Sequence, residues 1–194
     1  MNIHRNIKIY RQKGFALVEV LVSIFIMAIG MMALLGAQLR SVTSVRDSET
    51  QTIVAQAAQN LIEGMIANPT LTADGAWTKK SYDDYLNKTD TNVTSCNNIY
   101  QTGTTYDKAA LAERQLCSFK YELTQKLKDK GVKFQICQDN DFSDTPTIGS
   151  GGNIDGKCSN SGDTAIKVVW QVQPKDESTD DVQIMSFQTY VRDN

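Results

Sequence analysis

The clearest pattern along the chain is one long apolar segment close to the N-terminus. Residues 15–37 (FALVEVLVSIFIMAIGMMALLGA) contain a single charged residue, Glu19, and a single hydroxyl, that of Ser23. At about 1.5 Å of rise per residue, a helix of this length reaches roughly 34 Å, enough to cross the hydrocarbon core of a bilayer. We therefore predict a transmembrane helix here.

The residues that precede this segment have the opposite character. Residues 1–14 contain no acidic residue and four basic ones, Arg5, Lys8, Arg11 and Lys13. Basic residues favour the cytoplasmic side of a membrane, so we expect a cytoplasmic N-terminus and an exported remainder. A secretory signal peptide would end in small residues after its apolar region, and none stand out there. The break in character lies instead between Gly14 and Phe15.

Glu19 is a charge within this apolar segment. A carboxylate costs about 2.5–3.5 kcal/mol near the centre of a bilayer and less near its surface. Either Glu19 reaches the headgroups, or it pairs with a positive group at the same depth. Because no Lys or Arg lies on the same helix face inside the span, a free α-amino group on Phe15 of a neighbouring chain would suit the second interpretation.

The stretch KGFALVEVLVSIFIMAIG resembles the class III signal of type IV pilins and related pseudopilins. In that family a membrane peptidase cleaves between a glycine and a phenylalanine and methylates the new amine, and a glutamate four positions later guides docking into the filament. The resemblance implies cleavage between Gly14 and Phe15, N-methylation of Phe15 and an assembly role for Glu19. The longer run EVLVSIFIMAIGMMALLGAQLRS is most similar to minor pilins of the PilV type, over about the first quarter of the chain.

Helical periodicity continues beyond the apolar segment as far as Pro69, which ends the helix. Apolar positions recur at helical spacing: Leu39, Val42, Val45, Ile53, Val54, Ala57, Ala58, Leu61, Ile62 and Met65. An unbroken helix over residues 15–67 would be about 80 Å long, with Gly64 as a weak point of roughly 1 kcal/mol relative to alanine. We expect residues 15–40 to form the transmembrane and assembly half, and residues 41–68 an amphipathic half that packs on the exported domain.

Residues 69–131 are predicted to form a connector loop and a second helix. The first part, residues 70–106, is rich in Thr, Asn, Asp and Tyr without a clear period, which indicates loop with one helical turn near residues 82–86. We expect its aromatic side chains to pin this loop onto the core: Trp77, Tyr82, Tyr85 and Tyr100. The second helix is predicted from Asp107, as N-cap, to Lys130, with Gly131 following it.

Residues 132–194 are predicted to form an antiparallel sheet. Three strand candidates lie at residues 132–137, 165–173 and 182–191, and an acidic connection separates the last two. The expected fold class is therefore α+β, a long N-terminal helix packed on an antiparallel sheet. The same fold is implied by the resemblance to pilins.

Composition excludes some classes of protein. With 194 residues, 41% hydrophobic and 22% charged, the chain is neither collagen-like, fully disordered nor strongly basic. Removal of the leader leaves 16 positive against 22 negative charges, a net charge of −6 instead of −2. Because this balance repels phosphate, we expect no direct nucleic-acid partner.

Four cysteines lie on the exported side of the span: Cys96, Cys117, Cys137 and Cys158. An even number in an oxidising compartment predicts two disulfides, with three possible connectivities. We expect Cys96–Cys117 and Cys137–Cys158, because both separations are 21 residues and each pair joins a loop to a regular element. Zinc is disfavoured, since there is no C-x-x-C pair and the one histidine, His4, lies in the leader.

The acidic run Asp139, Asp141, Ser143 and Asp144 has oxygen ligands in the order of a calcium loop. It lacks the glycine at the sixth position and the glutamate at the twelfth, so we interpret it as an acidic loop and expect no metal or other cofactor. No enzyme activity is expected either. The mature chain has no histidine, its cysteines are predicted to be paired, and it contains no G-x-S-x-G, P-loop or S-x-x-K motif.

The resemblance implies a minor pilin, a structural subunit of a type IV pilus in the complex that primes or tips the filament, supporting twitching motility, adhesion or DNA uptake. The implied partners are prepilin peptidase, the inner-membrane assembly machinery, the major pilin and other minor pilins in a hetero-oligomer. The implied location is a single-pass inner-membrane protein with a periplasmic domain, later an extracellular pilus. Two alternatives stay open, a minor pseudopilin of type II secretion and a membrane-anchored periplasmic binding domain.

Overall fold

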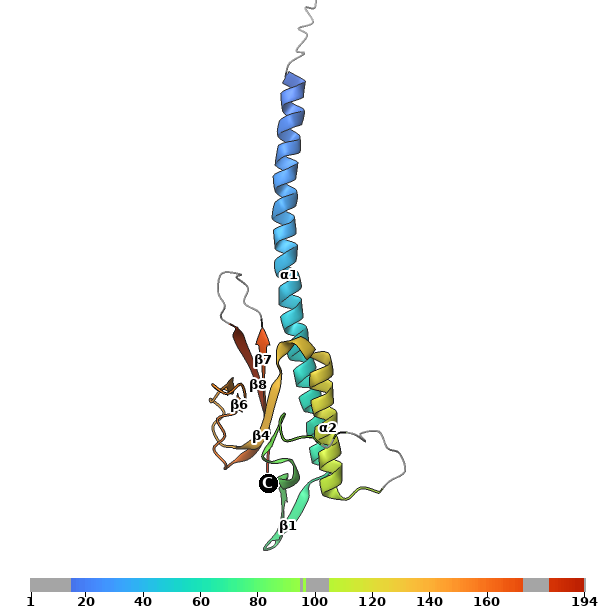
Figure 1. Ribbon diagram of the computed structural model, residues 1–194, viewed down its shortest axis with the longest axis vertical. Helices are drawn as coiled ribbons and strands as arrows, with labels where there is room; N and C mark the ends of the chain where they lie inside the picture. Colours follow the sequence, from blue (N-terminus) through green and yellow to red (C-terminus); the bar gives the residue numbers. More distant parts are fainter. Residues whose placement is uncertain (1–14, 95, 97–104, 173–181, 194) are drawn as a thin grey trace, which may run out of the picture. The chain divides into compact units, whose positions relative to one another are not determined.

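The computed structural model describes residues 15–94, 96, 105–172 and 182–193 (Figure 1). The chain divides into two units, Met1–Ser48 and Glu49–Asn194, and the helix α1 (Phe15–Ala67) contributes to both. After this long helix come antiparallel β-sheets and a second helix. The α+β class expected from the sequence is therefore confirmed.

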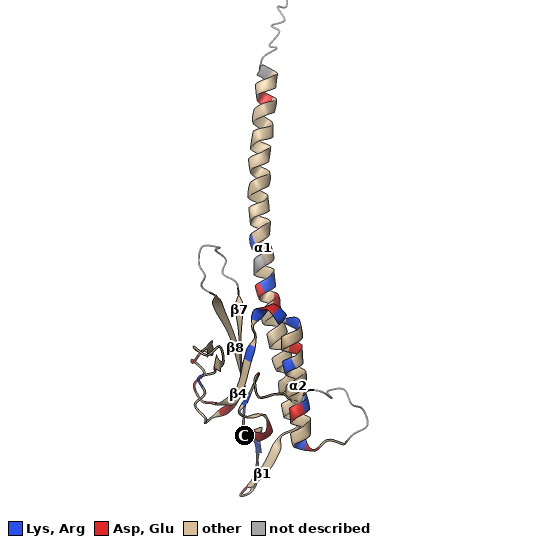
Figure 2. Cartoon of the chain, viewed as in Figure 1, with Lys and Arg blue, Asp and Glu red and all other residues tan. Residues whose placement is uncertain are grey.

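The first unit consists of the N-terminal part of α1. Its large apolar side chains from Leu17 to Val45 are all between 50% and 74% exposed. The helix is long and apolar enough to cross a membrane. Figure 2 shows how little charge it carries: between the red patch near its start, where Glu19 lies, and Arg40, no residue is charged.

The second unit has its own hydrophobic core, which the C-terminal part of α1 helps to form. One stripe of that helix is fully buried: Val54, Ala57, Ala58, Leu61 and Met65. The helix α2 (Lys108–Lys126) packs in the same cluster through Leu116, Phe119 and Leu123. The sheet supplies the third side of the core: Phe134, Ile136, Ile166, Val168 and Trp170.

The main sheet has four antiparallel strands in the order β3 (Lys88–Thr89), β4 (Lys133–Asp139), β7 (Asp163–Val172) and β8 (Gln183–Val191). The central strand β7 is buried on both faces. Alternate residues, Ile166, Val168 and Trp170, belong to the core shared with the helices. Its other face, with Ala165, Lys167 and Val169, is buried as well.

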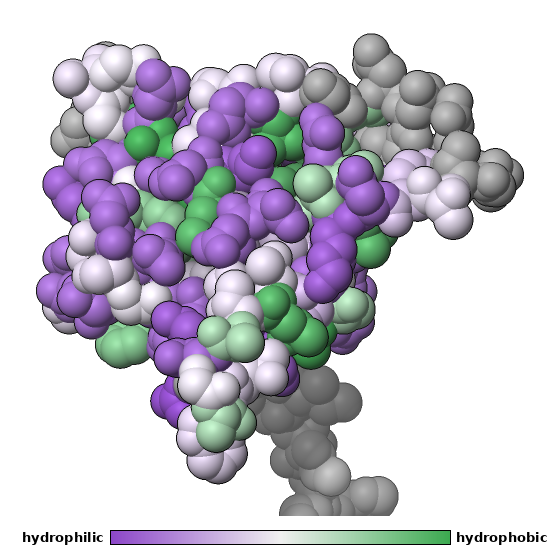
Figure 3. Space-filling model, turned by 90° about the horizontal axis from the view of Figure 1, so that it is seen from below, coloured by the Kyte–Doolittle hydropathy of each residue, from purple (hydrophilic) through white to green (hydrophobic). Residues whose placement is uncertain are grey.

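Between β4 and β7 the chain forms a second small β-hairpin. Its strands are β5 (Thr147–Ile148) and β6 (Ile154–Asp155), and it lies close to β8 and β4. The disulfide Cys137–Cys158 ties this segment to β4. Seen from one side, the surface of the domain is mostly hydrophilic, with small separate apolar patches (Figure 3).

The loop predicted at residues 70–106 is partly wrong. Its first part forms a hairpin of β1 (Thr70–Asp74) and β2 (Trp77–Ser81), and β3 also lies in this segment. Gly75, with φ of 61°, takes the first position of the two-residue turn, a backbone conformation that glycine adopts without strain. The strands showed no alternation in the sequence because both of their faces are exposed.

The aromatic residues of this segment behave differently from one another. Tyr82 and Tyr85 are buried and hold the segment on the core, as expected, and the helical turn is present as η1 (Asp83–Tyr85). Trp77 does not pin the loop, because it is 82% exposed on the hairpin. Tyr100 lies outside the described residues.

The second helix is shorter than predicted. Asp107 caps it, since its carboxylate accepts a hydrogen bond of 2.8 Å from the backbone N–H of Ala110. The α-helix ends at Lys126, and a separate turn, η2 (Lys128–Lys130), leads to Gly131 in the left-handed conformation, with φ of 56°. The acidic connection at residues 174–181 lies outside the described residues.

Candidate functional site

The N-terminal turns of α1 carry the candidate assembly site. The helix begins at Phe15, and Glu19 lies one turn further along it. Gly14 and the rest of the leader lie outside the described residues, so the cleavage site stays a prediction. The hydroxyl of Ser23 donates a hydrogen bond of 2.7 Å to the main-chain carbonyl of Glu19. This satisfies the serine within its own helix and leaves the Glu19 carboxylate as the unusual polar group of the segment.

The surroundings of Glu19 define what the site can do. Large apolar side chains cover the helix on all sides from Leu17 to Leu35, and all are exposed. A helix that is apolar all round is stable only in lipid or among other apolar helices. In either setting a carboxylate is costly unless a cation meets it at the same depth. The nearest basic residue that follows along the helix is Arg40, about 31 Å away by helical rise.

The two disulfides of the domain are Cys96–Cys117 and Cys137–Cys158, the pairs expected from the sequence. Their Cα atoms are 5.2 Å and 6.1 Å apart. The first joins the segment after β3 to α2, and the second joins β4 to the segment before β7. Each closes a loop of about 20 residues and is worth about 3 kcal/mol in the chain-entropy model.

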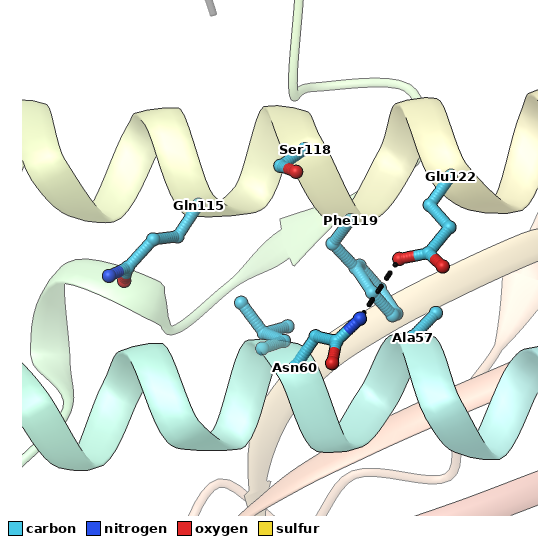
Figure 4. A pocket seen from close by; sticks show the side chains of 7 residues that line it. Ala57, Asn60, Gln115, Ser118, Phe119 and Glu122 are labelled. Atoms are coloured by element: carbon cyan, nitrogen blue, oxygen red, sulfur yellow. Dashed lines mark hydrogen bonds between the residues drawn. The ribbon is translucent and has the colours of Figure 1, made fainter.

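A small open cleft lies between α1 and α2 (Figure 4). It is lined by Ala57, Asn60, Leu61, Gln115, Ser118, Phe119 and Glu122. The amide of Asn60 donates a hydrogen bond of 3.3 Å to the carboxylate of Glu122 across it. Amides, a hydroxyl and one carboxylate over an apolar floor are what a hydrogen-bonded helix interface requires, and we assign the cleft no chemistry. That the chain is not an enzyme stays a prediction.

Next to this cleft, Gly64 has a structural role that its sequence position did not reveal. A Cβ atom there would lie 2.7 Å from the side-chain carboxamide carbon of Gln115. Gln115 in turn accepts a hydrogen bond from the hydroxyl of Tyr85, which itself accepts one of 3.1 Å from the amide of Asn68. The absence of a side chain at Gly64 therefore makes room for a buried polar network between the two helices.

The acidic run does not form a cation site. Asp139 is fully buried and pairs with the ammonium group of Lys167, which is also fully buried, at 2.5 Å. Its carboxylate also accepts a hydrogen bond of 3.1 Å from the hydroxyl of Tyr190. Asp141 accepts hydrogen bonds from Ser143, and Asp144 is exposed. Within the described residues, no group of three or more His, Cys, Asp or Glu could hold a metal.

The buried pair shifts the pKa values of its members. Burial by itself would raise the pKa of Asp139, but hydrogen bonds from Lys167, from the backbone of Asp141 and from Tyr190 outweigh burial and hold that pKa below its usual range. Burial, together with the hydrogen bond to Asp139, raises the pKa of Tyr190 to about 12. The sequence could not reveal this pair, because Lys167 lies 28 residues from Asp139.

Comparison with known proteins identifies one motif. Residues 9–35 match the prokaryotic N-terminal methylation motif, which includes the junction of Gly14 and Phe15 as well as Glu19. No curated protein and no solved structure matches the chain. The motif covers 27 of the 194 residues and supports the assignment of a type IV pilin-like or pseudopilin protein, processed by prepilin peptidase and anchored through its apolar helix.

Proposed function

We propose that this chain is a minor pilin, a non-enzymatic structural subunit that joins the complex priming or tipping a type IV pilus. There it would initiate assembly and support twitching motility, adhesion or DNA uptake. The observation that carries the proposal is the exposed apolar segment of α1, with Glu19 as its single carboxylate one turn after the predicted cleavage junction. The N-terminal methylation motif at residues 9–35 supports the same function.

The proposed mechanism begins in the membrane. Prepilin peptidase removes residues 1–14 and methylates the amine of Phe15, which places a positive charge at the end of α1. The carboxylate of one subunit's Glu19 then meets the N-terminal amine of a neighbouring subunit. In an apolar setting each charge alone is costly, whereas the pair offsets much of that cost. The electrostatics therefore favour one axial register between subunits.

The second unit supports a pilus rather than a secretion filament. The exported domain is relatively large and has two disulfides, which persist in an oxidising compartment such as the periplasm. This is consistent with a periplasmic domain before assembly and an extracellular one afterwards. The proposed partners are the assembly machinery of the inner membrane, the major pilin and other minor pilins.

The first experiment determines the mature N-terminus by mass spectrometry of the membrane protein. We expect a chain that begins at Phe15 and carries one methyl group on its amine. A chain that starts at Met1, or at a residue after the apolar segment, would contradict the proposal and would favour an anchored binding domain or a cleaved secretory protein.

The second experiment compares Glu19→Val with Ser23→Val. Both variants remove a polar group from the same segment, but Ser23 is already satisfied by its own helix. We expect Glu19→Val to be processed normally and to be recovered in sheared pili at least about tenfold less than wild type, the equivalent of about 1.4 kcal/mol. Equal recovery of the two variants would remove Glu19 from the mechanism.

A deletion strain distinguishes the pilus from the type II secretion pseudopilus. Loss of twitching with intact secretion supports the minor pilin. Loss of secretion with intact twitching would assign the same assembly chemistry to a pseudopilus.

A further inference from the structure

The outer edge of the main sheet carries an unusual strand. β8 is the last strand in the sheet order, and among the described residues no strand pairs with its outer side (Figure 1). It is nine residues long and pairs with β7 without a bulge, from Thr164 opposite Val191 to Val172 opposite Gln183. None of its residues (QIMSFQTYV) is charged or a proline.

Long, regular edge strands expose a row of unpaired backbone N–H and C=O groups. Proteins usually protect such an edge with lysine, proline, a bulge or a covering segment. In β8 the covering segment accounts for the C-terminal half only. There Gln188 donates a hydrogen bond of 3.0 Å to the carbonyl of Phe142, and the ring of Tyr190 lies 4.5 Å from the ring of Phe142.

The N-terminal half, residues 183–187, has no such cover among the described residues. Gln183, Ile184 and Ser186 are exposed, and Ile184 is 39% exposed. Met185 and Phe187 pack against the domain core but are only partly buried. An added strand would satisfy the free backbone groups and complete the burial of these two apolar side chains.

We propose that this half-strand binds the same half-strand of a second copy of the chain, in antiparallel register around Met185. The pairing places Met185 opposite its own counterpart, Ile184 opposite Ser186, and Gln183 opposite Phe187. Charge favours a second copy at this place. The domain from Glu49 to Asn194 has 14 basic and 20 acidic residues, so most approaches of two copies bring like charges together. The neutral edge of β8 avoids that repulsion.

Two sheets joined in this way form one continuous antiparallel sheet across a two-fold axis. The contact is self-complementary and closes at two copies. It does not depend on whether the subunit serves a pilus or a secretion filament, so its failure would leave the proposed function intact.

The test uses the full-length chain in its own membrane, with one added cysteine and a short bismaleimide crosslinker. All four native cysteines are in disulfides, so the added thiol is the one that reacts. Ser186→Cys places two thiols at diagonal positions of the proposed pair, where Cβ atoms lie about 7–8 Å apart or less. Tyr121→Cys, on the exposed face of α2, is the control for proximity caused by the membrane helices alone.

We expect an adduct of twice the chain mass with Ser186→Cys and at least tenfold less with Tyr121→Cys. In the Ser186→Cys background, Ile184→Lys should reduce the adduct at least tenfold, because it brings two lysines onto the shared edge. The matched control is Ile66→Lys on α1, where the isoleucine is 59% exposed, and it should leave the adduct unchanged.

A thiol count of one per chain verifies that each variant has formed its native disulfides. Gln183→Lys is a second way to break the pair, because this exposed residue lies outside the core cluster. Three results would overturn the proposal: equal adduct from the two cysteine positions, an adduct that survives both lysine variants, or an adduct whose mass shows a different partner.

Discussion

The exposed segment of α1 and the domain core contain similar side chains in opposite environments. Leu34 is 60% exposed, whereas Leu61 is 2% exposed in the same helix. The domain covers its part of the helix with α2 and the sheet, so the apolar stripe there has partners within the chain. In the first unit, the described residues supply no such cover. One helix therefore serves two purposes: its C-terminal part stabilises the fold, and its N-terminal part is available to lipid and to other subunits.

The two regions also differ in how they treat a carboxylate. Asp139 is buried in the domain and finds its cation, Lys167, within the same chain. Glu19 lies in an apolar segment in which its own unit offers no basic residue before Arg40. The first carboxylate is therefore expected to act on folding and the second on association. The predictions below test this division, from the largest expected effect to the smallest.

The buried ion pair provides the largest expected effect. Asp139→Asn leaves the Lys167 ammonium without its counter-charge in the core, which typically costs about 3–5 kcal/mol. Urea unfolding of the detergent-solubilised chain, followed by the fluorescence of the buried Trp170, measures this loss. Glu19→Val should leave the same unfolding curve unchanged.

Two controls accompany this prediction. Asp155→Asn removes one partner of an exposed ion pair with Lys157 and should leave the unfolding midpoint unchanged. The double variant Asp139→Leu/Lys167→Met replaces both buried charges and should recover most of the stability. If Asp139→Asn unfolds like wild type, the pair does not stabilise the domain.

The leucines give the second largest effect. Leu61→Ala should lower the free energy of unfolding of the domain by about 2–5 kcal/mol, because it leaves a cavity in the core. Leu34→Ala removes the same atoms from an exposed position and should leave that free energy unchanged. Similar losses in both variants would mean that the first segment also folds against the domain.

The glycines of α1 provide a smaller effect. Gly64→Ala gains about 1 kcal/mol of helix propensity but displaces Gln115 and disrupts its hydrogen bond with Tyr85. Because a buried group left without its partner costs about 1–3 kcal/mol, we expect a net loss of about 1 kcal/mol. Gly36→Ala meets no atom within 4 Å and should not destabilise the chain. Thermal unfolding of the two variants compares them, and a stabilised Gly64→Ala would show that the polar network contributes little.

Acid provides the most gradual test. Because the folded pKa of Asp139 lies below its unfolded value of about 3.8, its stabilising contribution is complete above that pH and is lost as the pH falls through the folded pKa. Burial raises the pKa of Asp193, so that residue contributes with the opposite sign. Urea midpoints measured below pH 4 should fall less steeply for Asp139→Asn than for wild type. Equal slopes would assign the acid sensitivity to other groups.

Local patterns in the sequence predicted much of this protein. The transmembrane segment, the α+β class and the N-cap at Asp107 depend on residues close together in the chain, and hydrophobic periodicity or side-chain chemistry expresses them directly. The same holds for the methylation motif, because a peptidase reads a contiguous segment. The cysteine pairs were predictable from equal spacing and from the elements they join.

Other features depended on partners that are remote in the sequence. The β1–β2 hairpin was missed because both of its faces are wet, so its strands have no reason to alternate. The acidic run suggested a cation loop, yet the fold of β4 and β7 brings Lys167 to Asp139. Gly64 seemed a weak point in a helix, but α2 uses the space that it leaves.

The sequence by itself determined where the chain meets the membrane and the processing machinery, because that information is contained in one continuous stretch of helix. Only the tertiary structure decided which charges are neutralised inside the domain, why α1 tolerates a glycine at its interface and which sheet edge is left open. Those properties arise from strand register and helix packing, which bring together residues that the linear pattern keeps apart.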